Sequence, residues 1–339
     1  MEKFLNKLAI FIGIVLILCS LVILLYIGFI ATFQYNPPDI IFVETTNNKE
    51  AAVPIDVPLS ATTFNIGFGA HSPNFSYYLD GGEDMISTDV DTIINNISFM
   101  LDEIIDTKPE IIFLQELDKS SKRSYYTDQP RMIERVLNNY ASVYTPNYRL
   151  QWIVYPFGNS IGYLNSNLMT FSSFEINENQ RLALHQSIKW YETLLAPDIA
   201  LLITRIPTQN DRELVLINLQ LFNIKEHLNI LEEIIITEYA KNNYVIVGGD
   251  FGQSITDISD DTRLSSRYKQ QKFFNNDVFY WAVDDQTYTK EDRNTLEQDI
   301  TDGFIFTKNI DLIKVRTTPT NFLYSDHRLV NVVFELDYK

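Results

Sequence analysis

The residues best placed for chemistry are polar side chains at the ends of short apolar segments. In the clearest segment, residues 244–251, four apolar and largely β-branched residues lead into two glycines and Asp250. This composition is typical of a short buried strand, and open α/β sheets hold their chemistry at the carboxyl ends of their strands. Similar settings occur at Asn65, Glu116, Asp302 and the pair Asp326-His327.

Each of these acids, taken alone, also fits a solvated strand end or an ordinary turn. Taken together, carboxylate and amide oxygens at strand ends are the ligands that a hard divalent cation such as Mg²⁺ prefers. A histidine next to an acid, as in the last pair, can act as a general base or contact a phosphate. The set therefore favours a metal site with an acid–base partner.

Alternating helix and strand patterns supply the elements that would position these residues. Helical spacing of apolar residues predicts helices over residues 88–106, 131–140 and 224–241. Thr88 is the expected cap of the first. Apolar, often β-branched segments predict strands over residues 61–66, 111–117, 201–206, 213–222, 302–306 and 328–336. A helix followed by a strand that ends in a carboxylate is a unit of α/β architecture.

An uncharged apolar segment, residues 8–33, exceeds the roughly 20 residues that cross a bilayer as a helix. It is too long for the core of a signal peptide, and no small-residue cleavage site follows it. Lys3 and Lys7 precede the segment, whereas Asp39 and Glu44 are the first charges after it. Because positive charge is retained in the cytoplasm, we expect a single-pass protein of the cell membrane with its domain outside the cytoplasm.

This helix and the proline-containing stretch after it divide the sequence into four parts. They are a cytoplasmic end at residues 1–7, the transmembrane helix at 8–33, a linker at 34–60 and a folded domain at 61–339. The only cysteine, Cys19, lies in the helix, so the domain relies on packing without disulfides. The net charge of −17 argues against a protein that grips duplex nucleic acid. A bound cation still allows a small phosphorylated substrate, and nothing indicates an oligomer.

From residue 62 to 336 the sequence resembles the endonuclease/exonuclease/phosphatase (deoxyribonuclease-I-like) superfamily. The resemblance rests on five short motifs in the family's order, which are Thr63-Phe-Asn-Ile66, Gln115-Glu116, Gly249-Asp-Phe251, Asp302-Gly-Phe-Ile305 and Ser325-Asp-His327. It implies a four-layer α/β/β/α sandwich of two mixed β-sheets flanked by helices. It also implies a hydrolase that cleaves phosphoesters with Mg²⁺ or Mn²⁺ as cofactor.

The resemblance assigns the metal side of the site to three residues. Glu116 would be the chief metal ligand, supported by Asn65 and Asp326. Asp250 would orient or deprotonate the attacking water. These residues are all present, so the metal side of the motif set is complete in this sequence.

The phosphate side departs from the family at two positions. His327, held by Asp302, is implied to contact the scissile phosphate in a site that includes Asn218. Gln220 stands where the family has a central histidine, and Gly252 stands where it has an asparagine. Loss of a positioned acid–base group costs about 10²–10⁴ in rate. Placing histidine and asparagine at these two positions is therefore expected to raise activity by at least about 10²-fold.

His71 and His227 are the nearby imidazoles that could replace the missing one. Three functions remain open at this point: a slow Mg²⁺-dependent phosphoester hydrolase, a non-catalytic surface module that binds a phosphorylated or lipid ligand, and a purely structural or adhesive ectodomain. The substrate class stays unknown, because members of the fold cleave nucleic acids, inositol phosphates and phospholipids.

Overall fold

Two mixed β-sheets lie face to face in the computed structural model, which describes residues 1–185, 189, 198–222, 225–255 and 277–337. Within these residues, the first sheet has seven strands in the order β1-β6-β7-β8-β9-β13-β10. Their bounds are β1 (Ile40–Phe42), β6 (Glu178–Ala183), β7 (Ala200–Pro207), β8 (Glu213–Gln220), β9 (Tyr244–Asp250), β13 (Asp302–Thr307) and β10 (Phe279–Ala282).

The second sheet has six strands in the described part of the chain, in the order β14-β15-β2-β3-β5-β4. Their bounds are β14 (Ile310–Thr317), β15 (Val330–Leu336), β2 (Leu59–Asn65), β3 (Ile111–Asp118), β5 (Gly162–Ser172) and β4 (Ala141–Ile153). Apolar side chains from both sheets fill the space between them. Phe113 of β3 and Phe304 of β13, for example, have ring centroids 6.0 Å apart.

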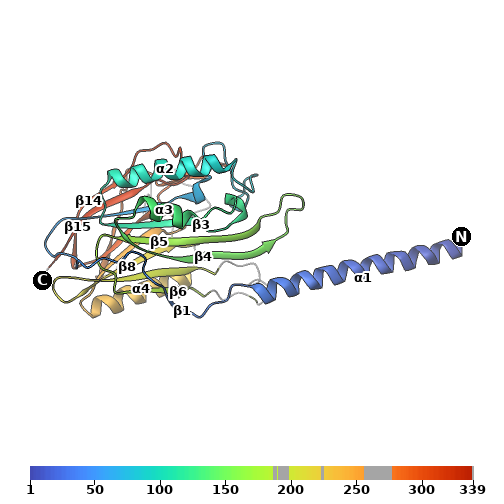
Figure 1. Cartoon of the computed structure of the whole chain (residues 1–339), viewed down its shortest axis with the longest axis horizontal. Coiled ribbons are helices and arrows are strands. Elements are labelled where there is room, and N and C mark those ends of the chain that lie inside the picture. Colours follow the sequence, from blue (N-terminus) through green and yellow to red (C-terminus); the bar gives the residue numbers. More distant parts are fainter. Residues whose placement is uncertain (186–188, 190–197, 223–224, 256–276, 338–339) are drawn as a thin grey trace.

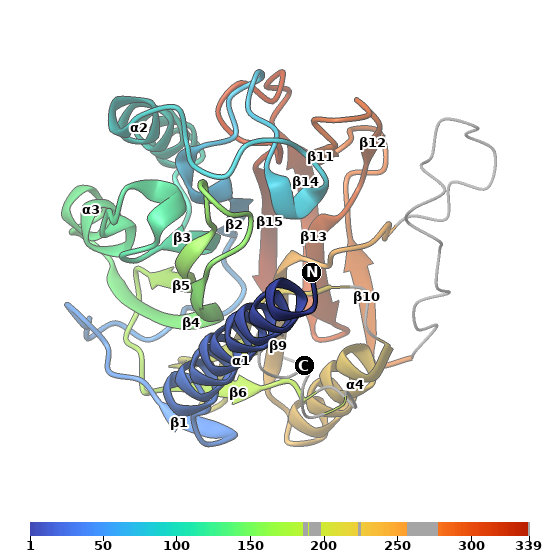
Figure 2. The ribbon, with the colours of Figure 1, turned by 90° about the vertical axis from the view of Figure 1, so that its right-hand side faces the viewer.

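Helices cover the outer faces of both sheets (Figure 2). Helices α2 (Val90–Asp106) and α3 (Gln129–Val136) pack on the second sheet, where Ile97 and Ile133 join the apolar residues of β3 and β5. Helix α4 (Lys225–Ala240) packs on the first sheet, with Leu231 against β8 and β9. The predicted four-layer α/β/β/α sandwich is therefore confirmed.

The N-cap of α2 lies one residue beyond the predicted cap. Asp89, rather than Thr88, caps the helix, because its carboxylate accepts a hydrogen bond from the backbone amide of Thr92 at 2.6 Å. An N-cap acid satisfies an amide that has no partner inside the helix and also favours the positive end of the helix dipole. The helix then presents one apolar face to the sheet, as its spacing predicted.

Helix α1 (Glu2–Phe33) extends away from the sandwich (Figure 1). It is the one helix among the described residues that is long and apolar enough to cross a membrane. The helix begins at Glu2, so it includes most of the short end that was expected to precede it. At about 1.5 Å per residue, its 32 residues measure roughly 48 Å.

Residues 34–60 do not form the expected linker. Strand β1 pairs with β6 at the edge of the first sheet, and Thr46 forms a bridge to Ser142. Val53 is fully buried in the core between the sheets, and its amide donates to the carbonyl of Pro207 at 2.8 Å. The prolines of this stretch favoured a tether on composition alone, but its apolar residues are used in packing.

Candidate active site

Polar side chains from five strands meet at one edge of the sandwich. Asp250, the last residue of β9, pairs with Gln220 at the end of β8 and with Asp302 at the start of antiparallel β13. Asn65 ends β2, and its Nδ2 donates to Oε1 of Glu116 on the adjacent parallel strand β3 at 3.1 Å. Strand order and register therefore bring together residues that are far apart in the sequence.

His327 is held in the middle of this group. Its Nδ1 lies 2.8 Å from Oδ2 of Asp302, which also accepts a hydrogen bond from the Thr301 hydroxyl. Its Nε2 lies 3.4 Å from Nδ2 of Asn65 and 3.7 Å from Oδ2 of Asp250. Burial and the Lys290 ammonium lower the pKa of His327, but Asp302, Asp250 and Asp326 outweigh them and raise it to about 9.

Lys290 joins the group from a loop that the sequence analysis did not single out. It lies in the short strand β11 (Lys290–Glu291), which pairs with β12 (Gln298–Asp299) and forms a bridge to His327. Its Nζ lies 2.9 Å from Nε2 of His327 and 3.7 Å from Oδ2 of Asp326. This part of the sequence is polar and has no apolar periodicity, so no pattern pointed to the lysine.

Glu116 faces the site because a β-bulge interrupts its strand. The pairing of β3 with β5 shifts between Leu114 and Leu117, and Glu116 has a positive φ of 58°. Bulges beside functional sites commonly change the direction of a side chain. Oε1 of Glu116 accepts a hydrogen bond from Nε2 of Gln220 at 2.6 Å, in addition to the one from Asn65. The amide of Gln220 is thus already committed to this carboxylate.

The buried side chain of Arg123 lowers the pKa of Glu116. This buried guanidinium donates two hydrogen bonds to Asp118, both of 2.9 Å, and lies 3.7 Å from the centre of the Phe68 ring. Its Nη2 lies 3.9 Å from Oε2 of Glu116. Burial raises the pKa of Glu116, but the charge of Arg123 lowers it, and the resulting pKa lies below the usual value. Arg123 follows a turn without a recognisable motif and was not predicted.

Asp250 differs from Glu116 in the direction of its pKa shift. Its Oδ1 accepts a hydrogen bond from the backbone amide of Gly252 at 2.9 Å, and its Oδ2 accepts one from Asn65 at 3.2 Å. Burial raises the pKa of Asp250, and the charge of Asp302 raises it further, against the lowering effect of His327. A carboxylate with a raised pKa is suited to accept a proton near neutral pH.

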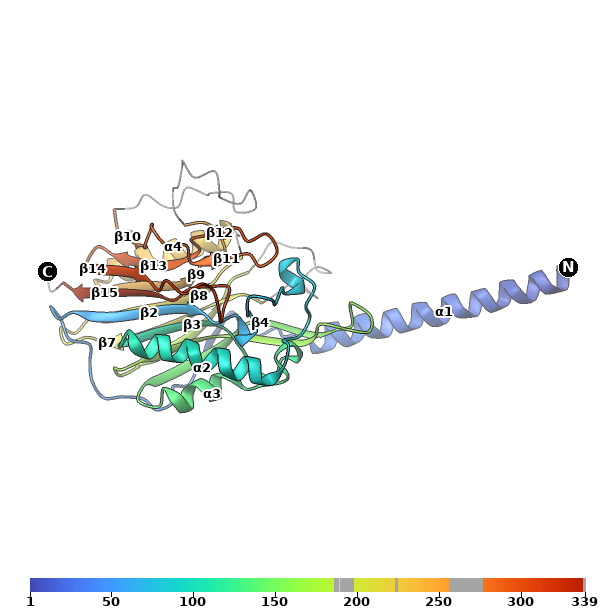
Figure 3. The same ribbon diagram turned by 90° about the horizontal axis from the view of Figure 1, so that it is seen from above.

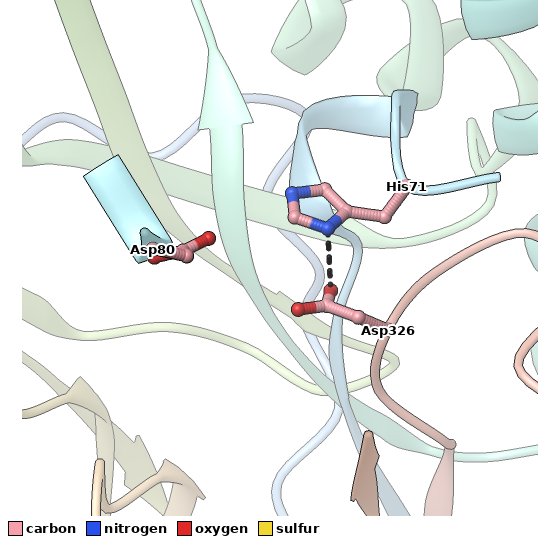
Figure 4. Close-up of side chains that lie close together, drawn as sticks. All are labelled: His71, Asp80 and Asp326. Carbon is pink, nitrogen blue, oxygen red and sulfur yellow. Dashed lines mark ion pairs between the residues drawn. The ribbon is translucent and has the colours of Figure 1, made fainter. Parts of the chain in front are cut away.

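Asp326 forms a second group with His71 and Asp80 (Figure 4). Oδ1 of Asp326 lies 3.2 Å from Nδ1 of His71, and one ligand atom from each of the three residues lies within 4.8 Å of the others. Neither nitrogen of the buried His71 ring has a hydrogen-bond partner among the described residues. Burial raises the pKa of Asp326, but His71 and Lys290 lower it, and the carboxylate is ionised.

A cavity of about 290 Å³ opens over these groups. Its wall contains the polar side chains of Glu116, Gln220, Asp250 and Asp326 and the cationic side chains of Lys290 and Arg293. The apolar side chains of Tyr77, Leu79 and Phe222 also line it. The cavity thus combines ionised carboxylates, fixed cations and an apolar rim.

Three residues named by the sequence analysis behave differently from the expectation. Asn218 donates to the backbone carbonyls of Leu114 and Met169 and so joins the two sheets beneath the site. His227 is buried in α4 and is absent from the cavity wall. Asn65 turns its amide oxygen toward the backbone amide of Gly67, at 3.0 Å, and presents its Nδ2 to the site. It therefore acts as a hydrogen-bond donor in this arrangement.

Comparison with known proteins identifies the fold. No protein-family model matches the sequence, and no curated protein matches it significantly. Among solved structures, an endonuclease/exonuclease/phosphatase from Beutenbergia cavernae has a TM-score of 0.54 at 15% identity and covers 83% of this chain and 72% of its own. A protein of the same description from Leptotrichia buccalis has a TM-score of 0.51 at 12% identity, over 83% of this chain and 100% of its own.

D. rerio TDP2, solved with a single-strand DNA product, has a TM-score of 0.50 at 14% identity, over 83% of this chain and 100% of its own. At such low identities the likeness concerns the fold. The resemblance that the five motifs indicated is confirmed at that level, because the domain has the sandwich of these proteins.

Proposed function

We propose that this chain is a divalent-cation-dependent phosphoester hydrolase whose domain is held at a membrane by α1. The observation that carries the proposal is the convergence, at one sheet edge, of a proton-accepting carboxylate, an acid-bound imidazole and two ionised carboxylates. These are Asp250, His327 with Asp302, and Glu116 with Asp326. Hydrolysis of a phosphoester needs a group that takes a proton from water and positive charge that stabilises the phosphoryl oxygens.

The donor set fits a divalent cation. Glu116 and Asp326 are ionised and line the same cavity, and Asp80 lies within reach of Asp326. Carboxylate oxygens of this kind suit Mg²⁺, and Mn²⁺ also accepts an imidazole such as that of His71. A bound cation supplies charge that polarises a phosphoryl oxygen and lowers the pKa of a water molecule.

The side chains themselves account for the remaining steps. Asp250, with its raised pKa, receives the proton of the attacking water. Asp302 accepts the Nδ1 proton of His327 and so fixes the orientation of the ring. Lys290, whose Nζ lies 2.9 Å from Nε2 of His327, supplies positive charge that stabilises a phosphoryl oxygen. Gln220 does not replace the missing imidazole, because its amide is occupied by Glu116.

A slow enzyme is expected from this arrangement, and one observation favours a second function. The side-chain amide of Gln220 is bonded to Glu116, and Gly252 has no side chain. Neither residue therefore offers a free hydrogen-bond donor to a bound phosphate. A binding module that retains phosphorylated ligands without cleaving them has the same requirements for charge but does not need Asp250 as a proton acceptor.

One experiment separates the two functions. The full chain in lipid nanodiscs is incubated with a chromogenic phosphodiester and Mn²⁺, and the rate is compared with that in EDTA. We expect release of the chromophore only with the metal, and its loss in Asp250→Asn. Stabilisation by the ester without any cleavage would favour the binding module, since a ligand that binds only the folded state raises the melting temperature.

The metal site has its own test. Millimolar Mn²⁺ is expected to raise the melting temperature of the full chain, and Glu116→Ala is expected to abolish this rise. Asp118 does not line the cavity but is unsuitable as a control, because its removal would leave the buried guanidinium of Arg123 without this partner. Glu233, exposed on α4 and absent from the cavity wall, offers a matched acidic position, and Glu233→Ala should retain the rise.

The proposed topology rests on the lysines that precede α1. Lys3 and Lys7 lie at its amino end, and retained positive charge places that end in the cytoplasm. Protease added to intact cells should then digest the domain and spare the short amino end. Protection of the domain until lysis would reverse the orientation.

A further inference from the structure

The hairpin that joins β4 to β5 carries large aromatic side chains in solvent. Trp152, Tyr155 and Phe157 at its tip are 42%, 55% and 85% exposed. Soluble domains seldom leave several such side chains together without a partner, and an exposed apolar cluster marks an interaction surface. The tip also projects beyond the sandwich, on the side from which α1 leaves (Figures 1 and 3).

Two contacts hold this hairpin beside α1. The hydroxyl of Tyr26, inside the helix, donates a hydrogen bond to the backbone carbonyl of Trp152 at 3.1 Å. Just after the helix, the ring of Tyr35 lies 4.6 Å from the guanidinium of Arg149, a residue of β4. The tip therefore lies level with the last part of the helix, and its position along the helix is known.

That position coincides with the edge of the bilayer. About 20 helical residues cross the hydrocarbon core, and counted from Leu8, the first residue after Lys7, they end near Ile27. Tyr26 then lies at the outer boundary of the hydrocarbon, where tyrosine and tryptophan are enriched in membrane proteins. The tip of the hairpin, bonded to Tyr26, lies at the same depth.

The mouth of the cavity lies on the same side of the domain. Tyr155 at the tip has its ring centroid 6.5 Å from that of Tyr78 in the short helix η2 (Tyr78–Asp80), whose Leu79 and Asp80 line the cavity. Phe222, which also lines the cavity and is 40% exposed, lies 5.9 Å from the ring of Tyr148 in β4. Figure 2 looks at the domain from the side of α1 and shows the hairpin between β4 and β5 next to the helix.

We propose that the hairpin tip inserts into the leaflet from which α1 emerges and presents the cavity to the phosphoester headgroups of membrane lipids. The insertion follows from the contacts with α1 and needs α1 to cross the bilayer, whereas the substrate class rests on the proposed hydrolase function. The net charge of −17 opposes binding through anionic lipids. The occupant of the aromatic surface is therefore the interface of a zwitterionic bilayer, entered by apolar contact.

Insertion is tested with single-tryptophan chains. The sequence has three tryptophans, at positions 152, 190 and 281. One chain keeps Trp152 (Trp190→Phe with Trp281→Phe), and the matched control keeps Trp281 (Trp152→Phe with Trp190→Phe). Trp281 packs against Phe251 in the first sheet. Each full chain is placed in nanodiscs of phosphatidylcholine with or without bromine on the acyl chains, because bromine quenches tryptophan fluorescence by contact.

We expect brominated lipid to quench Trp152 at least about twofold and to leave Trp281 unchanged. The proposal is overturned if Trp152 keeps its full fluorescence, or if both tryptophans are quenched equally. This readout does not depend on catalysis, so it stands even if the chain hydrolyses no ester.

A second variant tests the substrate class. Trp152→Ser combined with Phe157→Ser removes two of the three aromatic side chains of the tip, and neither of them lines the cavity. At an unchanged melting temperature, we expect hydrolysis of a phosphodiester carried by lipid in the nanodisc to fall at least about tenfold. Hydrolysis of a soluble phosphodiester should stay within about twofold. An equal fall for both esters, or none for the lipid ester, contradicts a lipid substrate, whereas silence toward both in the wild type contradicts the hydrolase function itself.

Discussion

Placing asparagine at position 252, as in the motif that the sequence resembles, should destabilise this protein. Gly252 has a φ of +63°, and a Cβ atom built on it would lie 2.0 Å from the carbonyl oxygen of Leu221. Asparagine tolerates the left-handed conformation better than most residues, so the conformation alone is not the obstacle. The obstacle is the contact with the backbone of Leu221. The Leu221 amide donates to the carbonyl of Asp250 at 2.9 Å, so this part of the backbone cannot move freely.

The cost can be worked out from the bonds that must shift. Moving Leu221 weakens its bond to Asp250, and moving Gly252 weakens the amide bond to the Asp250 carboxylate. A neutral bond contributes about 0.5–1.5 kcal/mol and one to a charged group about 1.5–3 kcal/mol. Together they predict a loss of about 2–4 kcal/mol, which lowers the melting temperature of a domain of this size by roughly 5–15 °C.

The assay compares Gly252→Asn with Gly252→Ala, which adds the same Cβ without the amide. We expect both full-length variants to melt several degrees below the wild type and to lose at least about tenfold in metal-dependent hydrolysis, since Asp250 loses a positioning bond. The reasoning is refuted if Gly252→Asn melts with the wild type, or if it gains activity while Gly252→Ala does not. The increase in activity expected from Gln220→His together with Gly252→Asn is therefore attributed to Gln220→His alone.

Further predictions concern the charged groups of the site. Gln220→His alone should raise phosphodiester hydrolysis by about 10²-fold, the low end for one acid–base group, because an imidazole can carry a proton and an amide cannot; an unchanged rate measured with Mn²⁺ would count against it. The pKa of about 9 for His327 lies above the unfolded value of about 6.5, so its contribution of about 3 kcal/mol is present below pH 6.5 and lost as the pH rises through 9. Thermal melting from pH 6 to pH 10 should show this fall in the wild type and a flatter profile in Asp302→Asn. Arg123→Met should cost about 3–5 kcal/mol in the free energy of unfolding, because it leaves a buried carboxylate without its partner; chemical denaturation that detects less than about 1 kcal/mol would show that the pair is dispensable.

The acids of the site were predictable because they end strands. Asp250 and Glu116 each follow an apolar strand, and the ends of parallel strands meet at one edge of a sheet. The pair Asp302 and His327 was expected from the resemblance, and the structure joins them at 2.8 Å. In each case the local sequence identified the residue, and the order of the strands determined where it lies in the site.

Residues from loops could not be predicted in the same way. Lys290 and Asp80 lie in short elements without apolar periodicity, and only the fold brings them to the cavity. Arg123 was also missed, since a buried guanidinium is recognised by its partners rather than by its neighbours in sequence. The stretch 34–60 misled for the opposite reason: its prolines are typical of a linker, but Val53 fills a place in the core.

The most direct test of the central claim follows the fate of a water molecule. The full chain in nanodiscs is incubated with a phosphodiester and Mg²⁺ in water enriched in heavy oxygen, and the product is observed by phosphorus NMR. If Asp250 activates water for attack on phosphorus, the product phosphoryl group carries one solvent oxygen, seen as an isotope shift, and it forms neither in EDTA nor in Asp250→Asn. No labelled product above the level of Asp250→Asn would contradict the account.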